Sequence, residues 1–388
     1  MRRAEIDWLR VLAFGALVPL HAAIPFVPGG LPLIQNDRTS AVLNIAVLWL
    51  HEFRLPLLFL VAGMGMAFSL RRRSGGGFLA ERVRRLLIPL LVGILVVVPP
   101  MVYLEYRFTG AIRPGFIDFY RGLFNTGIYP RGNLSWHHYW FVAYLFLFAV
   151  AALPVVQFLR HPRRRRWMTT ARVVILWGPM IYAPIVPLAA AEILLRARFP
   201  GVPDLLHDWA NIVLWFQVMM LGLAFAAWPA LFARAERLRL PSLILAIDLS
   251  QVLYWVYVAP MEHPLRLDSM PAWQYLMLCM LRAANIWCWL LAITGYASRH
   301  FRRDSALLRY LNRAVFPLFC LHLPVAVAAS YWVVGTAWPL WPKYLFVLAT
   351  SLLIPLAVYH WLLRTVPPLG LLFGLAPHRK PTPLRKHP

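Results

Sequence analysis

A histidine lies deep inside the first long apolar run of this chain. His21 is roughly 20 Å along a helix from Trp8, far below a membrane surface. Ionisable side chains are costly in hydrocarbon, and by default they indicate a function there. A neutral imidazole can take a proton from a hydroxyl, so His21 is a candidate general base. A packed histidine bonded to a neighbouring helix is the alternative.

Asp7 lies on roughly the same helix face as His21, about four turns earlier. The separation of ~21 Å is too large for contact. We therefore expect Asp7 to pair with Arg10 or a loop arginine at the cytoplasmic surface.

Three further ionisable residues, His51, Glu52 and Arg54, stand close together in the second apolar run. They form either an interfacial patch where a helix begins or a polar wall of an active cavity. In the second case, Glu52 and Arg54 pair with each other or with a substrate.

Two arginines precede the third apolar run. Arg82 and Arg85 are three residues apart and so share a helix face. Guanidinium groups bind phosphates through paired hydrogen bonds, which would suit a polyanionic cofactor at the cytoplasmic edge. Ordinary loop arginine is the competing interpretation, and it is sufficient for the arginine run at 163–166.

Two more histidines occur in informative surroundings. His138 and Trp140 belong to an aromatic cluster at 135–141, which is also typical of a membrane-interface belt. His322 stands between Pro317 and Pro324 in a late apolar run. It is a candidate cavity residue, although a structural hydrogen bond explains it equally well.

One pair of charges is expected to be structural. Asp248 and Arg282 lie in the middle of two apolar runs, and an unpaired charge there is expensive. We therefore expect them to pair. The sequence shows no Gly-x-Ser-x-Gly elbow, Cys-x-x-Cys, phosphate loop or His-Glu-x-x-His, and we predict no metal site.

The composition predicts the elements that hold these residues. The chain has 388 residues, of which 61% are hydrophobic, and its mean hydropathy is +0.62. A soluble domain would be about 45–50% apolar. We predict an all-α polytopic membrane protein of about ten transmembrane helices, without a soluble domain. The predicted spans are 8–27, 43–70, 86–104, 138–159, 173–195, 210–232, 241–260, 273–297, 314–334 and 344–363.

Arginine and lysine predict the orientation. With the N-terminus inside, the inner segments carry roughly three times as many of these residues as the outer ones, which places both termini in the cytoplasm. Residues 365–388 then form a basic cytoplasmic tail. We attribute the net charge of +24 to these loops and their anionic lipid contacts, not to nucleic acid. Residues 8–27 are interpreted as a retained helix, not a signal peptide.

Taken in order, these stretches resemble the acyltransferase 3 family of integral membrane O-acyltransferases. Ala62 stands where the family has Ser, and Phe319 where it has Tyr. Within the family, the His-x-Phe-Arg at 51–54 and the Glu-Arg-Val at 81–83 are most similar to the branch of glucans biosynthesis protein C, a succinyltransferase. The motifs are Asp7-Trp8-Leu9-Arg10 with His21, Phe59 to Gly63, Arg82-x-x-Arg85 with Pro89, Trp136 to Phe141, and Phe316 to His322.

The resemblance implies an acyltransferase of the inner membrane. Its co-substrate would be cytoplasmic acyl-CoA, and its acceptor a hydroxyl of an envelope glycan or glycolipid. His21 would be the catalytic base and Arg82 and Arg85 would hold CoA, with direct transfer favoured because no serine or cysteine nucleophile stands out. The acyl group (acetyl or succinyl) and a homo-oligomeric state are left open.

Two other classes fit parts of the sequence. A proton-coupled transporter of an anionic or lipid-linked substrate would also use kinked helices and buried charges. Such a carrier needs no acyl-CoA and leaves its substrate unmodified. A polytopic scaffold explains the loop arginines but not the buried histidines.

Overall fold

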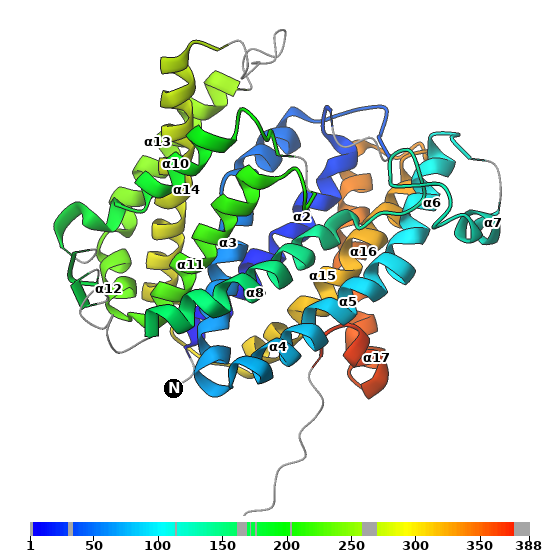
Figure 1. Cartoon of the computed structure of the whole chain (residues 1–388). Coiled ribbons are helices and arrows are strands. Elements are labelled where there is room, and N and C mark those ends of the chain that lie inside the picture. Colours follow the sequence, from blue (N-terminus) through cyan, green and yellow to red (C-terminus); the bar gives the residue numbers. More distant parts are fainter. Residues whose placement is uncertain are drawn as a thin grey trace, which may run out of the picture. The chain divides into compact units, whose positions relative to one another are not determined.

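Helices form all the regular structure in the described part of the chain. The structure is a computed structural model that describes residues 3–29, 34–112, 115–160, 169–170, 172–174, 177–201, 204–257 and 270–375 (Figure 1). Within these ranges no strand forms, and Ile128 and Leu134 make an isolated bridge. The predicted all-α fold is confirmed.

The helices follow the predicted apolar runs. In chain order, the long helices and the segments that join them are α1 (Ala4–Gly15), α2 (Leu17–Ala23), η1 (Ile24–Phe26), α3 (Ala41–Arg72), α4 (Gly75–Arg82), η2 (Val83–Leu87), α5 (Ile88–Val92), η3 (Gly93–Val97), α6 (Val98–Phe108), α8 (Trp140–Arg160), α10 (Ile185–Leu195), α11 (Trp209–Ala227), α13 (Arg239–Tyr257), α14 (Ala272–His300), α15 (Ala306–Val333), α16 (Leu340–Val358) and η7 (Tyr359–Leu363). The shorter elements are α7 (Phe116–Arg121), η4 (His137–Tyr139), η6 (Gly178–Tyr182), α12 (Ala230–Arg237) and α17 (Pro367–Leu372).

Among the described residues, nine helical stretches are long and apolar enough to cross a membrane. They correspond to nine of the ten predicted spans and confirm a polytopic membrane protein. The nine are Ala4–Phe26, Ala41–Arg72, Gly75–Phe108, His137–Leu159, Gly178–Leu195, Trp209–Ala227, Ala272–His300, Ala306–Val333 and Leu340–Leu363.

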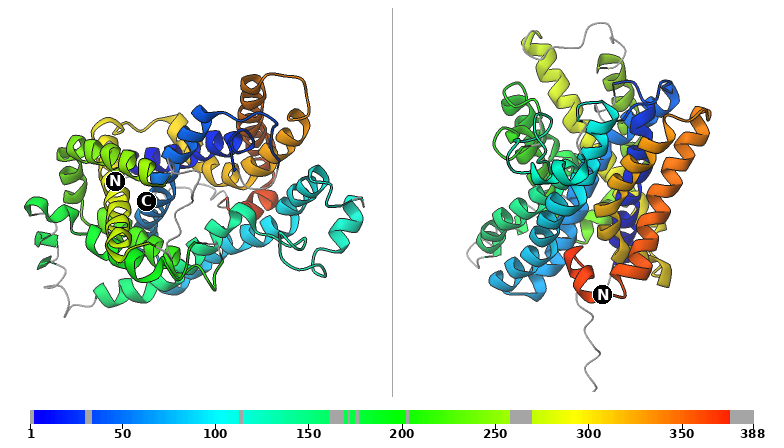
Figure 2. Two further views of the ribbon diagram at one scale, coloured as in Figure 1. Left: turned by 90° about the horizontal axis from the view of Figure 1, so that it is seen from above. Right: turned by 90° about the vertical axis from the view of Figure 1, so that its right-hand side faces the viewer.

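The seventh predicted span is the exception. Its helix α13 forms and packs along α14 (Figure 2), but it is not one of the nine. Asp248, Ser250 and Gln251 place three polar side chains in the middle of this helix. The end of the predicted span, 258–260, lies outside the described residues, as does most of the basic tail.

The orientation depends on whether α13 crosses the membrane. We predict that it does, because ten crossings keep the arginine-rich segments on one side. A reporter that is active only outside the membrane should then be silent when fused at Pro388 and active when fused at Gly127. An active fusion at Pro388 would mean an odd number of crossings.

Proline residues interrupt the helices at two informative places. Pro19 has no N–H to donate to the carbonyl of Gly15, and the chain breaks between α1 and α2 at Ala16. Pro324 lies inside α15 and leaves the carbonyl of Cys320 without its helical partner. A buried carbonyl of this kind needs another donor.

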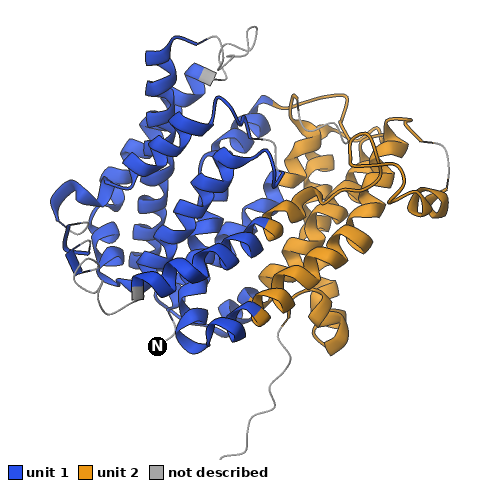
Figure 3. Cartoon of the chain, in the orientation of Figure 1, with its two compact units in different colours: residues 1–20, 41–79, 144–312 blue, residues 21–40, 80–143, 313–388 orange. Residues whose placement is uncertain are grey.

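The described residues form two compact units (Figure 3). Unit 1 comprises residues 1–20, 41–79 and 144–312, and unit 2 comprises 21–40, 80–143 and 313–388.

Unit 1 is held by a close approach of α3 and α11. A Cβ atom at Gly63 would overlap the Met219 carbonyl, and one at Gly222 would overlap the Leu60 carbonyl. Small residues allow such backbone contacts between membrane helices. Phe59 stacks on Trp215 beside them, with ring centroids 5.8 Å apart. The Phe59 to Gly63 motif therefore serves helix packing.

Most of an unusual long helix belongs to unit 2. The segments from α4 to α6 join into one helical stretch, Gly75–Phe108, in which η2 and η3 are single π-helical turns. Such turns occur frequently at functional sites. Gly93, at the start of η3, lies against the ring of Tyr139, where a Cβ atom would not fit.

Candidate active site

Two of the predicted histidines are direct partners in unit 2. His21 lies in α2, shortly after the break at Ala16, and His322 lies in the middle of α15. The Nδ1 atom of His21 is 2.8 Å from the Nε2 atom of His322. His322 is 1% exposed, whereas His21 is only partly buried and can meet a substrate.

The hydrogen bonds of His322 assign the protons of both rings. Its Nδ1 atom is 2.8 Å from the carbonyl oxygen of Phe319, which can only accept. That nitrogen must therefore carry the proton, and Nε2 of a neutral His322 accepts from His21. His21 then donates through Nδ1, and its Nε2 atom carries the lone pair that can accept a proton.

His138 joins this pair through the carbonyl that Pro324 releases. The Nε2 atom of His138 is 3.3 Å from the Cys320 oxygen, and the Tyr139 hydroxyl donates to the same oxygen at 3.2 Å. The rings of His138 and His322 have centroids 5.7 Å apart. Cys320 thus contributes its backbone, while its thiol is fully buried.

The three histidines form a cluster with two proton-accepting nitrogens. Because His138 donates through Nε2, its Nδ1 atom carries a lone pair. Nδ1 has no hydrogen-bond partner among the residues that the structure describes, although His138 is buried. The ring of Phe319 lies against His138 with centroids 5.2 Å apart and forms an apolar wall. We refer to His21, His138 and His322 as the histidine cluster.

Trp140 follows His138 by two residues in the sequence. It begins α8, is half-buried, and meets Phe141 edge-on with centroids 6.2 Å apart. Phe141 in turn contacts Phe319 at 5.7 Å. Trp140 therefore supports the wall through Phe141.

Sequence reasoning missed a second arrangement in unit 2. His137 Nε2 lies 3.1 Å from a carboxylate oxygen of Glu105, which is 2% exposed, and its Nδ1 lies 2.5 Å from the Ser135 hydroxyl. Burial, together with the charge and hydrogen bond of Glu105, raises the pKa of Tyr129, whose ring contacts His137. The only signal in the sequence was a glutamate at the edge of an apolar run.

The geometry of His137 is strained. Its φ angle is +39°, which is uncommon for a residue with a side chain. Its own N–H donates to the Ser135 hydroxyl at 3.1 Å, so part of this contact is local and fixes the start of α8. The Ser135–His137–Glu105 order is nevertheless that of a nucleophile, a base and an orienting acid.

The two predicted phosphate-binding arginines meet at one carboxylate. Arg82 lies 3.1 Å and Arg85 lies 3.4 Å from opposite oxygens of Glu81, as expected for residues on one helix face. The side chain of Arg85 is 45% exposed and that of Arg82 is 18% exposed. Glu81 holds two guanidinium groups close together, and the shared charge leaves an excess of one positive charge.

The long helix sets the distance between the arginines and the histidine cluster. Arg85 precedes Gly93 by roughly 12 Å along the helix axis. Gly93 contacts Tyr139, which is bonded to the same carbonyl as His138. An extended cofactor with phosphates at one end and a reactive group at the other could connect the two places.

The predicted pair of Asp248 and Arg282 is wrong. Arg282 instead lies 3.3 Å from Glu192, which is fully buried and also holds Arg196. Asp248 is exposed. On the same helix Ser250 faces α14, and two residues correspond to about 200° of rotation. Asp248 therefore points away from Arg282.

The third predicted group, His51 with Glu52 and Arg54, lies in unit 1. Glu52 does not pair with Arg54, because it accepts a hydrogen bond of 2.7 Å from Asn285. Arg54 is buried beside the ring of His51, with its Nη2 atom 3.3 Å from Nδ1. Near the N-terminal end of α1, Asp7 pairs with Arg10 at 3.8 Å as predicted, and Asn312 bridges them.

Comparison with known proteins gives one result. A family model for acyltransferases, described as an acyltransferase domain, matches residues 3–360. No curated protein and no solved structure matches the chain. The matched range includes the histidine cluster and both arginines.

Proposed function

Since this chain belongs to the acyltransferase 3 family and its helices make it a multi-pass membrane acyltransferase, we propose that it uses acyl-CoA from the cytoplasm to acylate a hydroxyl of an envelope glycan or glycolipid. The observation that carries the proposal is the oriented pair of His21 and His322. The buried charges alone would also fit a proton-coupled carrier. Membership of an acyltransferase family favours acyl transfer over transport.

In the proposed reaction, His21 first accepts a proton and then returns it. His21 Nε2 accepts the proton of the acceptor hydroxyl as its oxygen attacks the thioester carbon. The carbon–sulfur bond then breaks, and His21 returns the proton to the departing thiolate. While His21 is charged, its Nδ1–H donates to Nε2 of His322, and this hydrogen bond stabilises the imidazolium. His322 stays neutral, because its own proton remains on Nδ1 and is donated to the carbonyl oxygen of Phe319.

His138 and the neighbouring Phe319 hold the substrates in this proposal. His138 Nδ1 can accept a hydrogen bond from a second hydroxyl of the molecule that receives the acyl group. The apolar face of Phe319 suits either a sugar ring or the acyl chain. Acetyl and succinyl groups remain the candidates, with the succinyl branch suggested by the residues around His51 and Glu81. The inner membrane is the proposed location.

Arg82 and Arg85 are proposed to bind the phosphates of acyl-CoA. Arg85→Ala should weaken acyl-CoA binding by about 10- to 100-fold, because charge-assisted hydrogen bonds contribute ~1.5–3 kcal/mol. Arg85→Lys should rescue only partly, because lysine lacks the forked geometry. Binding is measured by titrating purified protein with acyl-CoA.

Arg84 provides the matched control. It lies in the same π-helical turn as Arg85 and is exposed, and the two ion pairs described for Glu81 are with Arg82 and Arg85. Arg84→Ala removes the same charge and should leave affinity within a few-fold of the parent. If the Arg82→Ala, Arg85→Ala double variant binds as well as the parent, these arginines only orient the chain in the membrane.

The Ser135–His137–Glu105 arrangement supports a second mechanism, in which Ser135 carries the acyl group before the acceptor arrives. Direct transfer predicts that Ser135→Ala keeps transfer within a few-fold of the parent. Loss of transfer in Ser135→Ala, together with an acyl adduct on the parent peptide by mass spectrometry, would establish the covalent route.

The acceptor and the acyl group need a separate experiment. Envelope glycans and lipids from cells with the gene, without it, and with the His21→Ala variant are compared by mass spectrometry. The proposal requires an ester-linked acyl group that only the parent gene restores. A purified protein that moves a substrate across vesicles without consuming acyl-CoA would instead identify a carrier.

A further inference from the structure

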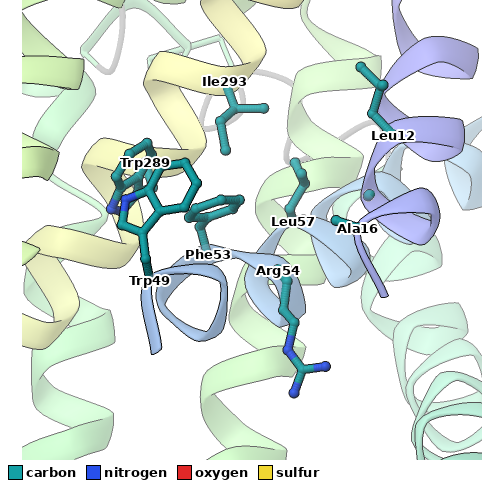
Figure 4. A pocket seen from close by; sticks show the side chains of 9 residues that line it. Leu12, Ala16, Trp49, Phe53, Arg54, Leu57, Trp289 and Ile293 are labelled. Carbon is teal, nitrogen blue, oxygen red and sulfur yellow. The ribbon is translucent and has the colours of Figure 1, made fainter. Parts of the chain in front are cut away.

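Unit 1 contains a cavity within its membrane-spanning helices. It has a volume of about 230 Å³ and is lined by α1, α3 and α14 (Figure 4). The small side chains of Ala13 and Ala16 leave the space on one side. All the residues that line it are apolar except Arg54. The others are Leu12, Ala13, Ala16, Trp49, Phe53, Leu57, Trp289 and Ile293.

The aromatic wall of the cavity is fixed. Trp289 donates from its indole nitrogen to the Ser250 hydroxyl at 3.0 Å. Its ring lies 4.8 Å from Phe53 and 5.4 Å from Trp49, centroid to centroid. Such a wall holds the cavity open in a constant shape, because each ring is supported by the next.

The polar edge of the cavity is formed by Arg54, and the described residues place no carboxylate beside it. Arg54 is 8% exposed, and no carboxylate among the described residues lies within ion-pair distance of it. The neighbouring Glu52 is bonded to Asn285 instead. The Nε atom of Arg54 has no hydrogen-bond partner in the described part of the chain, and its one polar neighbour is His51. A buried cation without a counter-ion is strongly unfavourable.

The cavity also opens where lipid is available. Leu12 and Trp49, which border it, are 45% and 47% exposed and lie in membrane-spanning helices. A hydrocarbon chain can enter such an opening without losing contact with apolar surroundings. The guanidinium at the other edge matches the planar oxygens of a carboxylate or the oxygens of a phosphate.

We propose that this cavity binds an anionic lipid, with its hydrocarbon chain against the aromatic wall and its phosphate or carboxylate on Arg54. The site needs no acyl transfer, so it stands or falls independently of the proposed reaction. Phosphate lipids and fatty acids share the required chemistry, and they are separated by experiment.

The test uses native mass spectrometry of the full chain in detergent, after removal of co-purified lipid. Three probes are added in turn: phosphatidylcholine, phosphatidic acid and oleate. The parent should retain one phosphatidic acid or one oleate at concentrations where phosphatidylcholine is released. Retention of only one anion identifies the head group, and equal release of all three overturns the proposal.

Variants assign the binding to this cavity. Arg54→Gln should lower the affinity for the anionic probe by about 10- to 100-fold, because it removes charge-assisted hydrogen bonds. Arg54→Lys should recover part of it. Ala16→Phe fills the cavity but keeps Arg54, so it should lower retention even if Arg54→Gln accumulates poorly.

Arg121→Gln is the matched control, because Arg121 is a cation whose side chain is 77% exposed outside the membrane spans. It should retain the probe as the parent does. Parental retention in both Arg54→Gln and Ala16→Phe, or equal loss in Arg121→Gln, would mean that lipid binds by general charge at the surface.

Discussion

Replacing His21 by Ala should lower acyl transfer by about 10²–10⁴-fold, the usual loss when a general base is removed. The reason is specific to the hydrogen bonds of unit 2. His322 fixes the proton of His21 on Nδ1 and leaves Nε2 as the accepting atom. Transfer is measured with purified protein and labelled acyl-CoA, alongside the amount of protein in the membrane.

The pH dependence separates a base from a packing residue. Parental activity should fall as pH is lowered and His21 takes up a proton, because an imidazolium cannot accept another. His21→Gln should abolish transfer while keeping a polar side chain of similar length. His360→Ala, which alters an exposed histidine of the same unit, should leave transfer and membrane level unchanged.

Two outcomes would contradict the assignment of His21. Transfer within a few-fold of the parent in His21→Ala would shift the role to another cluster member, and His138 has the other accepting nitrogen. Loss of transfer that only follows poor accumulation in the membrane would make His21 a structural residue.

The helical fold was accessible from the sequence because hydrocarbon leaves few solutions. Every backbone polar group must be satisfied within the span, so apolar runs of span length become helices. The seventh run shows the limit of this argument. Polar residues such as Asp248 and Gln251 weaken its signal, and length and hydropathy alone do not settle whether α13 crosses.

The candidate site was predictable in part. The depth of His21 and the prolines around His322 indicated buried imidazoles, and Pro324 identifies Cys320 as a carbonyl in need of a donor. That His138 is this donor depends on the approach of segments far apart in the chain. No periodicity within one segment contains that information.

Charged pairs also divide into those that the sequence predicts and those that depend on packing. Asp7 and Arg10 are three residues apart on one helix, and their contact follows from helical geometry. Arg282 has several acidic residues at similar depth, and the choice of Glu192 over Asp248 depends on which face each helix turns inward. Depth can be read from a sequence, whereas the facing partner is fixed by packing.

Removing His322 should also lower transfer, by about 10- to 100-fold, although His322 need not touch either substrate. Its Nε2 atom accepts the hydrogen bond that orients His21 and stabilises the charged imidazolium, and a hydrogen bond to a charged group contributes ~1.5–3 kcal/mol. His322→Ala is therefore expected to act through kcat, with a smaller change in KM. Transfer is measured at saturating and limiting acyl-CoA.

A double variant tests whether His322 acts through His21. If His322 only positions the base, His322→Ala should have little further effect once His21 is already Ala, because residues that act as one unit are not additive. Ser330→Ala is the matched control, since Ser330 is equally buried in α15 and bonds within its own helix. Its transfer should stay near that of the parent. Fully additive losses in the double variant, or an equal loss in Ser330→Ala, would show that His322 supports the folded helix and not the base.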